Sequence, residues 1–194
     1  MDVDVLGPDD AQAALPGEER CKGGIYRMVS DKLILDATCG SRSILFQKDE
    51  PHTLYVDQRE FNTEKRFGSK DSLRKYICKP DVISSFTSLP FPDNSFYHVV
   101  FDPPHLVRAG DDAWLTLKYG KLPQDWQSVI KQGFSECMRV LKPNGTLIFK
   151  WSDVQVTTRE VIDAIGMEPL YGHRSGKKMN THWMAFMKMP EIQT

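Results

Sequence analysis

The segment Lys32-Leu-Ile-Leu-Asp-Ala-Thr-Cys-Gly-Ser41 decides the fold. Its apolar residues predict a buried strand that ends at Asp36, and Gly40 predicts a tight turn four residues later. Ile44–Phe46 then predicts the start of a helix. A second apolar run, Thr53–Asp57, predicts another strand that also ends in an acid. Because the carboxyl ends of parallel strands meet at one edge of a sheet, we expect the two acids to lie together.

The rest of the chain continues this alternation of strands and helices. Further strands are predicted at Val82–Ile83, Tyr97–Phe101, Thr146–Phe149, Glu168–Tyr171 and His182–Met187, and helices at 126–141 and 157–165. This order predicts an α/β fold: a Rossmann-like, doubly wound, mostly parallel seven-stranded sheet. No helix separates the last two strands, so the last strand is expected to be antiparallel. The polar stretch 59–79, rich in Lys and Arg, receives no assignment.

Composition indicates one domain with an acidic head. The 194 residues carry a net charge of -1, but residues 1–20 alone carry -5, which leaves +4 on the rest. We expect residues 1–20 to be a flexible extension and residues 21–194 to form a single domain. A mildly basic domain permits a polyanionic partner without requiring one.

Cysteine spacing and hydropathy limit the class of protein. The four cysteines lie far apart and form no Cys-x-x-Cys pair, which predicts reduced thiols and no metal site. Cys39, beside the turn, is expected to be a small packing residue. No apolar run approaches the roughly 18 residues of a membrane span, and the acidic N-terminus is unlike a signal peptide. We therefore expect a cytoplasmic protein that does not enter membranes; the sequence does not indicate its oligomeric state.

The predicted strand ends suit a nucleoside ligand. Gly40 allows a ligand to approach the backbone, and Asp57 can accept hydrogen bonds from both ribose hydroxyls. A nicotinamide dinucleotide is the alternative, because it uses the same acid. The full Gly-x-Gly-x-x-Gly pattern is absent, however, which leaves a pyrophosphate poorly bound and favours a nucleoside without phosphates.

Four motifs, in order, resemble those of class I S-adenosylmethionine-dependent methyltransferases. They are Asp36-Ala-Thr-Cys-Gly-Ser-Arg42, Asp57-Gln-Arg59, Leu89-Pro-Phe-Pro-Asp-Asn-Ser-Phe96 and Asp102-Pro-Pro-His105. The chain is most similar to small phage and prophage N-methyltransferases with an Asp-Pro-Pro-His motif, related to N6-adenine and N4-cytosine methylases. The resemblance covers about residues 30–188 and also includes Val140–Gly145 and Phe149–Trp151.

The resemblance implies S-adenosyl-L-methionine as cofactor. The turn that contains Asp36, Ala37, Thr38, Cys39 and Gly40 would hold its amino acid part, and Asp57 would hold its ribose. Asp102 would also border the cofactor. The family usually has an acid for the adenine amino group where this chain has Ser85, so we expect a weaker uncharged hydrogen bond there and more stacking by Phe86.

The Asp-Pro-Pro-His motif resembles that of enzymes that methylate planar amino groups. Such a nitrogen is a poor nucleophile until acceptors hold its two N–H groups. The resemblance assigns these contacts to the Asp102 carboxylate and the Pro103 carbonyl, in a turn made rigid by Pro104. His105 stands where an aromatic residue of the family stacks on the base. Because the normal pKa of histidine is about 6.5, protonation of His105 would make activity depend on pH near that value. This reaction requires no metal.

Three features around the site have two interpretations each. Arg108–Lys121 is long enough to form a lid or a packed surface loop. Lys150 can contact a phosphate or be solvated, and the basic loop His173–Lys178 can bind a nucleic acid backbone or be a solvated charge run.

The leading hypothesis is an N-methyltransferase that acts on an exocyclic amine in DNA or RNA, adenine N6 in DNA being the first choice. No spare 80 to 100 residues or so remain for a target-recognition domain, which favours RNA, a short DNA context or help from a partner. Methylation of a protein glutamine or a small amine is an alternative. A non-catalytic cofactor-binding partner subunit is another.

Overall fold

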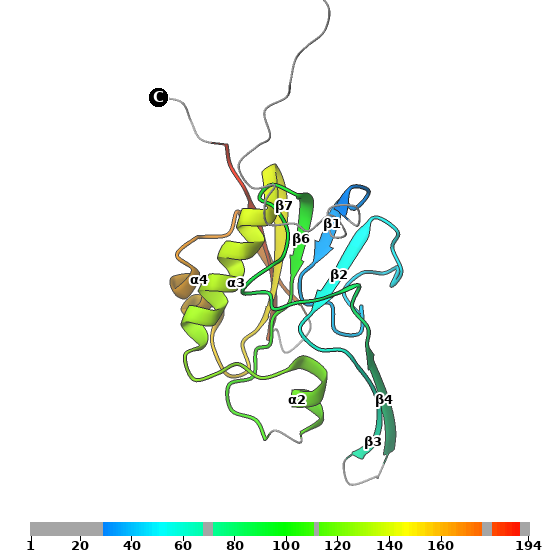
Figure 1. Ribbon diagram of the computed structural model, residues 1–194. Coiled ribbons are helices and arrows are strands. Elements are labelled where there is room, and N and C mark those ends of the chain that lie inside the picture. Colours follow the sequence, from blue (N-terminus) through cyan, green and yellow to red (C-terminus); the bar gives the residue numbers. More distant parts are fainter. Residues whose placement is uncertain (1–28, 68–71, 111–112, 176–179, 191–194) are drawn as a thin grey trace, which may run out of the picture.

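A computed structural model describes residues 29–67, 72–110, 113–175 and 180–190 (Figure 1). A seven-stranded sheet has the order β5-β2-β1-β6-β7-β9-β8. The strands are β1 (Ile34–Asp36), β2 (Thr53–Asp57), β5 (Val82–Ile83), β6 (Phe96–Phe101), β7 (Leu141–Ser152), β8 (Tyr171–Ser175) and β9 (Thr181–Met187). All are parallel except β9, which is antiparallel to both β7 and β8. The predicted fold class is confirmed.

β1 lies at the point where the strand order reverses. It pairs with β2 on one side and with β6 on the other, in parallel with both. In a doubly wound sheet, the carboxyl ends of the strands at such a switch point form the ligand crevice. The ends of β1, β2 and β6 carry Asp36, Asp57 and, one residue later, Asp102.

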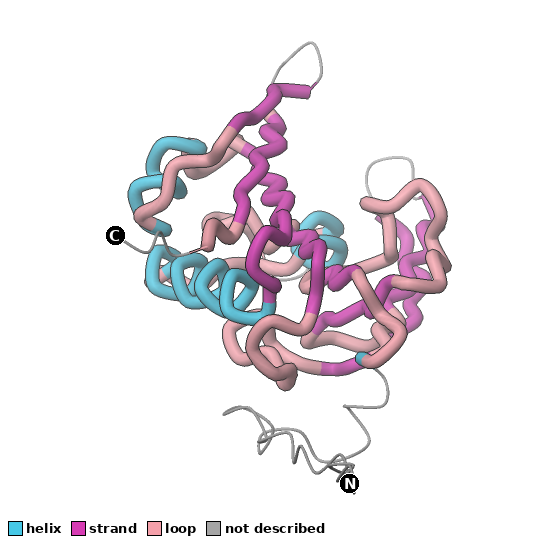
Figure 2. Tube along the Cα trace, turned by 90° about the horizontal axis from the view of Figure 1, so that it is seen from above, coloured by secondary structure: helices cyan, strands magenta, loops and turns pink. Residues whose placement is uncertain are grey.

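The core lies between the sheet and two helices, α3 (Trp126–Val140) and α4 (Thr158–Ile165). One row of buried residues crosses five strands in register: Leu54, Leu35, Val99, Leu147 and Phe186. Figure 2 shows both helices on the same side of the sheet. The helices were predicted correctly because their apolar residues recur at helical spacing, as Ile130, Phe134 and Cys137 do.

The helix predicted to start at Ile44–Phe46 is wrong. Residues 41–49 form turns and bends, and Phe46 is fully exposed. Arg42 has a φ of 55°, outside the right-handed helical region, and its guanidinium donates hydrogen bonds to Asp49 and Asp81. A turn held by these contacts replaces the helix.

The unassigned stretch 59–79 forms an antiparallel hairpin, β3 (Phe61–Phe67) and β4 (Ser72–Cys78), apart from the main sheet (Figure 1). The hairpin packs on a short helix, α2 (Trp114–Tyr119), through the edge-to-face contact of Tyr76 with Trp114, whose ring centroids are 6.0 Å apart. The stretch that received no assignment is therefore a β-hairpin with its own two-stranded sheet.

The strand predicted at Glu168–Tyr171 lies later, because β8 begins at Tyr171 and extends to Ser175. Pro169 has no N–H to donate, and pairing with β9 starts with the Leu170 N–H, which donates to the Ala185 carbonyl. The predicted basic loop thus begins within β8; its residues 176–178 lie outside the described residues, as does the predicted extension 1–20. None of the helices in the described ranges is both long and apolar enough to span a membrane.

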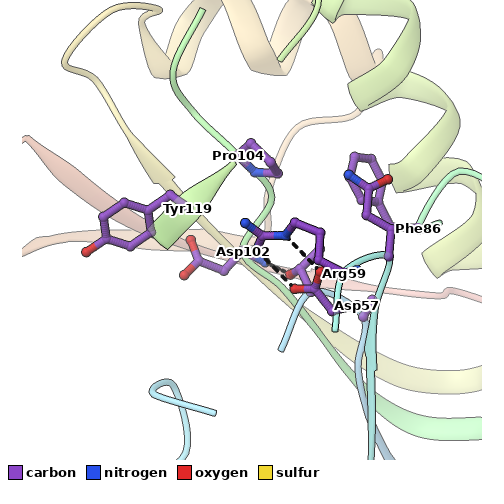
Figure 3. Close-up of a pocket in the computed structure, with 9 residues that line it drawn as sticks. Asp57, Arg59, Phe86, Asp102, Pro104 and Tyr119 are labelled. Atoms are coloured by element: carbon purple, nitrogen blue, oxygen red, sulfur yellow. Dashed lines mark hydrogen bonds and ion pairs between the residues drawn. The ribbon is translucent and has the colours of Figure 1, made fainter. Parts of the chain in front are cut away.

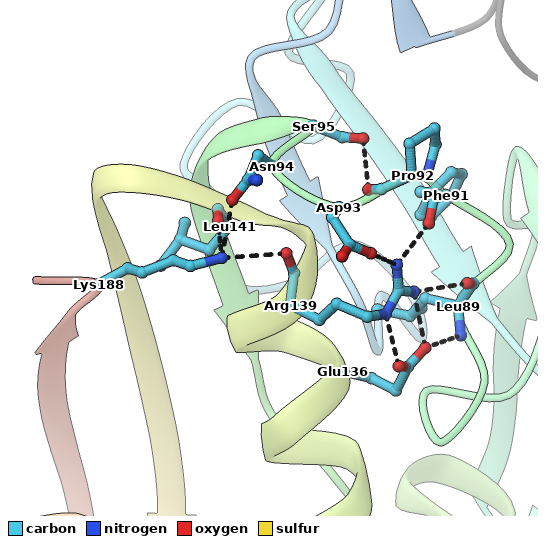
Figure 4. Close-up of polar contacts among 10 residues, drawn as sticks. All are labelled: Leu89, Phe91, Pro92, Asp93, Asn94, Ser95, Glu136, Arg139, Leu141 and Lys188. Atoms are coloured by element: carbon cyan, nitrogen blue, oxygen red, sulfur yellow. Dashed lines mark hydrogen bonds and ion pairs between the residues drawn. The ribbon is translucent and has the colours of Figure 1, made fainter. Parts of the chain in front are cut away.

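Arg139 fastens the Leu89–Phe96 loop to α3 (Figure 4). Its guanidinium donates to the carbonyls of Leu89 and Phe91 and to the carboxylates of Asp93 and Glu136, at 2.7–3.0 Å. The Glu136 carboxylate in turn accepts a 2.8 Å hydrogen bond from the Leu89 N–H. These contacts raise the pKa of Arg139, first through Glu136, and satisfy loop carbonyls that would otherwise lack partners.

We predict that Arg139→Met lowers the free energy of unfolding by about 2–4 kcal/mol, because it removes the cation that pairs with Glu136 and the donor of two loop carbonyls. Urea unfolding followed by circular dichroism measures this change. Arg159→Met is the matched control: Arg159 also forms two ion pairs, but its side chain is 64% exposed, so its loss should lower the stability far less. Equal losses in the two variants would contradict the prediction.

Candidate active site

The turn after β1 is hydrogen-bonded to both neighbouring strands. The Ala37 N–H donates to the Val100 carbonyl of β6 at 3.0 Å, and the Cys39 N–H donates to the Val56 carbonyl of β2 at 2.8 Å. The Thr38 hydroxyl accepts a 2.8 Å hydrogen bond from the Asp102 N–H. These bonds fix the turn relative to the ends of all three strands.

Gly40 is required by its conformation and by its neighbour. Its φ is 49°, and a Cβ there would lie 2.9 Å from the Tyr76 hydroxyl oxygen. Its N–H donates to Asp57 Oδ2 at 3.1 Å. In the structure Gly40 therefore brings the turn close to the hairpin and to Asp57.

A pocket opens at this edge of the sheet (Figure 3). It is lined by Ala37, Thr38, Asp57, Gln58, Arg59, Phe86, Asp102, Pro104 and Tyr119. Its walls thus come from the turn after β1, from the ends of β2 and β6, and from α2. Within the described residues, no group of three or more His, Cys, Asp and Glu side chains is arranged to hold a metal ion.

The guanidinium of Arg59 forms an ion pair with the carboxylate of Asp57. Its Nε lies 3.1 Å from Asp57 Oδ1, and its second terminal nitrogen lies 3.3 Å from Oδ2 (Figure 3). The other terminal nitrogen donates to the Leu117 carbonyl of α2 at 3.2 Å. Arg59 therefore connects the predicted ribose acceptor to the helix above the pocket.

Asp102 is paired with Lys150 of the neighbouring strand. Lys150 Nζ lies 2.6 Å from Asp102 Oδ2, and the Asp102 side chain is only 14% exposed. Burial raises the pKa of Asp102 above its ordinary value, and the Lys150 charge opposes this effect. The alternative of a solvated Lys150 does not describe the structure.

Asp36 forms no ion pair with any residue that the structure describes, in contrast to Asp57 and Asp102. It is completely buried; Oδ1 accepts a 3.3 Å hydrogen bond from the Thr38 N–H, whereas Oδ2 has no partner among the described residues. Burial, with smaller effects from Asp102 and Asp57, raises the pKa of Asp36 to about 7. Asp36 is thus close to half protonated near neutral pH.

Ser85 and Phe86 occupy different environments. The Ser85 hydroxyl lies 2.8 Å from the Thr87 hydroxyl and accepts from the Thr87 N–H, and Ser85 does not line the pocket. Phe86 does line it and packs edge-to-face on Phe101 at 5.4 Å. It fits against α3 because Gly133 has no side chain; a Cβ there would lie 2.4 Å from the Phe86 ring.

His105 lies among aromatic rings. Its ring centroid is 5.3 Å from that of Tyr119 and 6.4 Å from that of Trp151. Burial lowers the pKa of His105, and Asp102 partly opposes this effect, so the ring favours the neutral form. Tyr119 belongs to α2, so the segment predicted as a lid reaches the motif.

A further contact of the Arg108–Lys121 segment is between Gly120 and Pro104. Gly120 has a φ of 79°, and a Cβ there would lie 3.0 Å from Pro104 Cγ. The described part of the Arg108–Lys121 segment thus packs over the pocket through its backbone as well as through Tyr119. Its opening and closing remain a prediction.

The structure brings together half of the predicted site residues. Those that line the pocket are Ala37, Thr38, Asp57, Phe86, Asp102 and Pro104, and those that lie around it are Asp36, Cys39, Gly40, Ser85, Pro103 and His105. Sequence reasoning missed Gln58, Arg59 and Tyr119 as lining residues. Arg59 was part of the Asp57-Gln-Arg59 motif, which was a usable signal. Tyr119 lies in the Arg108–Lys121 segment, predicted to be a lid or a packed surface loop, but its place in the pocket depends on how α2 packs.

Comparison with known proteins shows the fold. Protein PH0226 of Pyrococcus horikoshii OT3 has a TM-score of 0.52 and 14% identity, over 86% of this chain and 87% of that chain. A SAM-dependent methyltransferase of Methanosarcina mazei has a TM-score of 0.47 and 14% identity, over 88% and 99%. For the 1,6-didemethyltoxoflavin-N1-methyltransferase of Burkholderia thailandensis, solved with S-adenosylhomocysteine, the values are 0.46 and 12%, over 85% and 74%. No protein-family model and no curated protein matches the chain.

We predict that stability falls as pH rises from about 4 to about 7. A folded-state pKa near 7 for Asp36, against an ordinary value of 3.8, means that the folded chain retains a proton that the unfolded chain releases. The full difference corresponds to up to about 4 kcal/mol, at ~1.4 kcal/mol per pH unit. Asp36→Asn should flatten this dependence in urea titrations at successive pH values, whereas Asp49→Asn, at an 88% exposed carboxylate, should not.

Proposed function

We propose that the protein is an S-adenosylmethionine-dependent N-methyltransferase that acts on an exocyclic amino group in nucleic acid, adenine N6 in DNA being the first candidate. The observation that carries this proposal is that the Asp102 carboxylate and the Asp57 carboxylate line one pocket. The first belongs to an Asp-Pro-Pro-His turn and the second to the predicted ribose site. A methyl acceptor and a nucleoside cofactor would thus meet there.

The residues at the pocket fit the cofactor chemically. Asp57 presents a carboxylate for two ribose hydroxyls, and Oδ2 of Asp36 is a buried acceptor that lacks a donor, beside the turn that would hold the amino acid part. Phe86 offers an aromatic ring to the adenine. The Arg59 guanidinium donates to both oxygens of Asp57, so it would have to leave Asp57 before a ribose could bind there.

The reaction needs a good methyl donor and a well-held amine. S-adenosylmethionine, when bound, would supply a sulfonium methyl group to the lone pair of the amine, with S-adenosylhomocysteine as the leaving group and the proton from nitrogen passing to solvent. Asp102 would accept a hydrogen bond from one N–H and the Pro103 carbonyl from the other. Holding the amine in this geometry directs its lone pair towards the methyl group.

The acceptor would contact aromatic and basic parts of the chain. Tyr119 lines the pocket and His105 lies beside it, so both are placed to stack on a base. Residues 59–79, which include the β3–β4 hairpin, carry seven basic and three acidic residues, a composition that favours binding to a phosphate backbone.

The three described cysteines are free, which supports a cytoplasmic location.

The experiment is a transfer assay with tritiated S-adenosylmethionine and purified DNA, RNA or protein extract. Label in DNA as N6-methyladenine supports the proposal in full. Label in RNA, in protein glutamine or in a small amine would show that this molecule, and not adenine in DNA, is the methyl acceptor. If no fraction gains label while calorimetry shows cofactor binding, the protein is a cofactor-binding partner subunit and the enzyme proposal fails.

We predict that Asp102→Asn lowers kcat by at least about 100-fold, because the amide cannot replace the charged acceptor. The dissociation constant of S-adenosylhomocysteine, measured by calorimetry, should stay within about threefold of the wild-type value. Asp57→Asn is the converse control and should weaken cofactor binding by about tenfold or more. A large loss of cofactor affinity in Asp102→Asn would show that the residue belongs to the cofactor site instead.

A further inference from the structure

Lys150 lies on an interior strand of the sheet, with a neighbouring strand on each side. It lies in β7, which pairs with β6 on one side and β9 on the other, and it stands in register with Trp183 of β9. Its ammonium nitrogen is 5.7 Å from the centre of the Trp183 ring and 2.6 Å from Asp102 Oδ2. Two neighbouring strands therefore determine where this charge lies.

The burial of the pair distinguishes it from the surface ion pairs of the protein. The side chains of Lys150 and Asp102 are 24% and 14% exposed, against 64% and 59% for Arg159 and Asp163. A surface lysine available to bind a phosphate would extend into solvent. The side chain of Lys150 instead points to the carboxylate of Asp102. Removing one partner from such a pair leaves the other charge buried and unpaired.

We propose that Lys150 is a positioning residue of the site: its ammonium group holds Oδ2 of Asp102, fixes the plane of the carboxylate and leaves Oδ1 to accept from the substrate amine. The hydrogen bonds of the described residues leave Oδ1 without a partner. The role assigned to the amine rests on the proposed function. The pairing with Asp102 does not.

Charged groups from several elements surround the Asp102 carboxylate. Lys150 approaches from β7, Lys118 from α2, His105 from the same turn and Asp36 from β1. Burial raises the pKa of Asp102, and Lys150 is the largest influence that lowers it. Loss of the Lys150 charge should therefore shift the carboxylate towards its protonated form, which is a poor acceptor.

The first test measures the pairing without any methyl acceptor. NMR follows the side-chain carboxyl carbons of ¹³C-labelled aspartate through a pH titration of the full chain, and Asp102→Asn identifies the Asp102 signal. In Lys150→Met this signal should titrate at least about one pH unit higher than in the wild type. Lys142→Met, at the other end of β7, is the matched control and should leave it unchanged.

The second test measures the role in catalysis. At neutral pH, Lys150→Met should lower kcat by about 100-fold. The acid limb of the pH dependence of kcat should move to higher pH in this variant, so that part of the activity returns near pH 9. Lys150→Arg keeps the charge and should stay within about tenfold of the wild type with an unshifted limb. Lys150→Gln repeats the test with a polar side chain if Lys150→Met does not fold.

The outcomes separate this inference from the proposed function. An Asp102 titration that is the same in wild type and Lys150→Met overturns the inference, whatever the activity. A shifted titration with an unchanged pH profile overturns the positioning role. If the wild-type chain labels no acceptor, the proposed function fails, while a shifted titration still supports the assignment of Lys150 as the group that holds Asp102.

Discussion

Three carboxylates converge where β1, β2 and β6 end, and the electrostatics of the site follow from this constraint. Like charges at close range in a buried region oppose one another, so each must find a cation or a proton. Asp57 is paired with Arg59 and Asp102 with Lys150, whereas Asp36 retains a raised pKa. The two cations thus leave one carboxyl group to take up a proton near neutral pH.

The sheet brings these charges together through backbone geometry. β1 lies between β2 and β6, so the turn after it can hydrogen-bond to both, and Thr38 accepts from the Asp102 N–H across this junction. The two cations are placed close to their acids by the chain and by the sheet. Arg59 lies two residues after Asp57, and Lys150 lies on β7, the strand that pairs with β6. Cofactor chemistry and amine chemistry would thus share one hydrogen-bonded framework.

The sheet and the two long helices could be predicted from the sequence because strand ends, helical periodicity and turn residues are local signals. The failures were also physical. Ile44–Phe46 has an apolar pattern too short to outweigh the contacts of Arg42, and the β3–β4 hairpin is too polar to show a buried strand period. The acids of the site were predicted from the strand ends, but the pairing of Lys150 with Asp102 depends on strand register, which no local pattern contains.

Arg59 links events at the pocket to events above it. The guanidinium that covers the Asp57 oxygens also donates to the Leu117 carbonyl of α2. A ligand whose hydroxyls took both Asp57 oxygens would have to displace the guanidinium, and the contact with α2 would then have to re-form elsewhere or break. Because Tyr119 of the same helix lies against His105, the proposed ribose site and the proposed methyl-acceptor site both contact α2. The order in which cofactor and acceptor bind would follow from this one side chain.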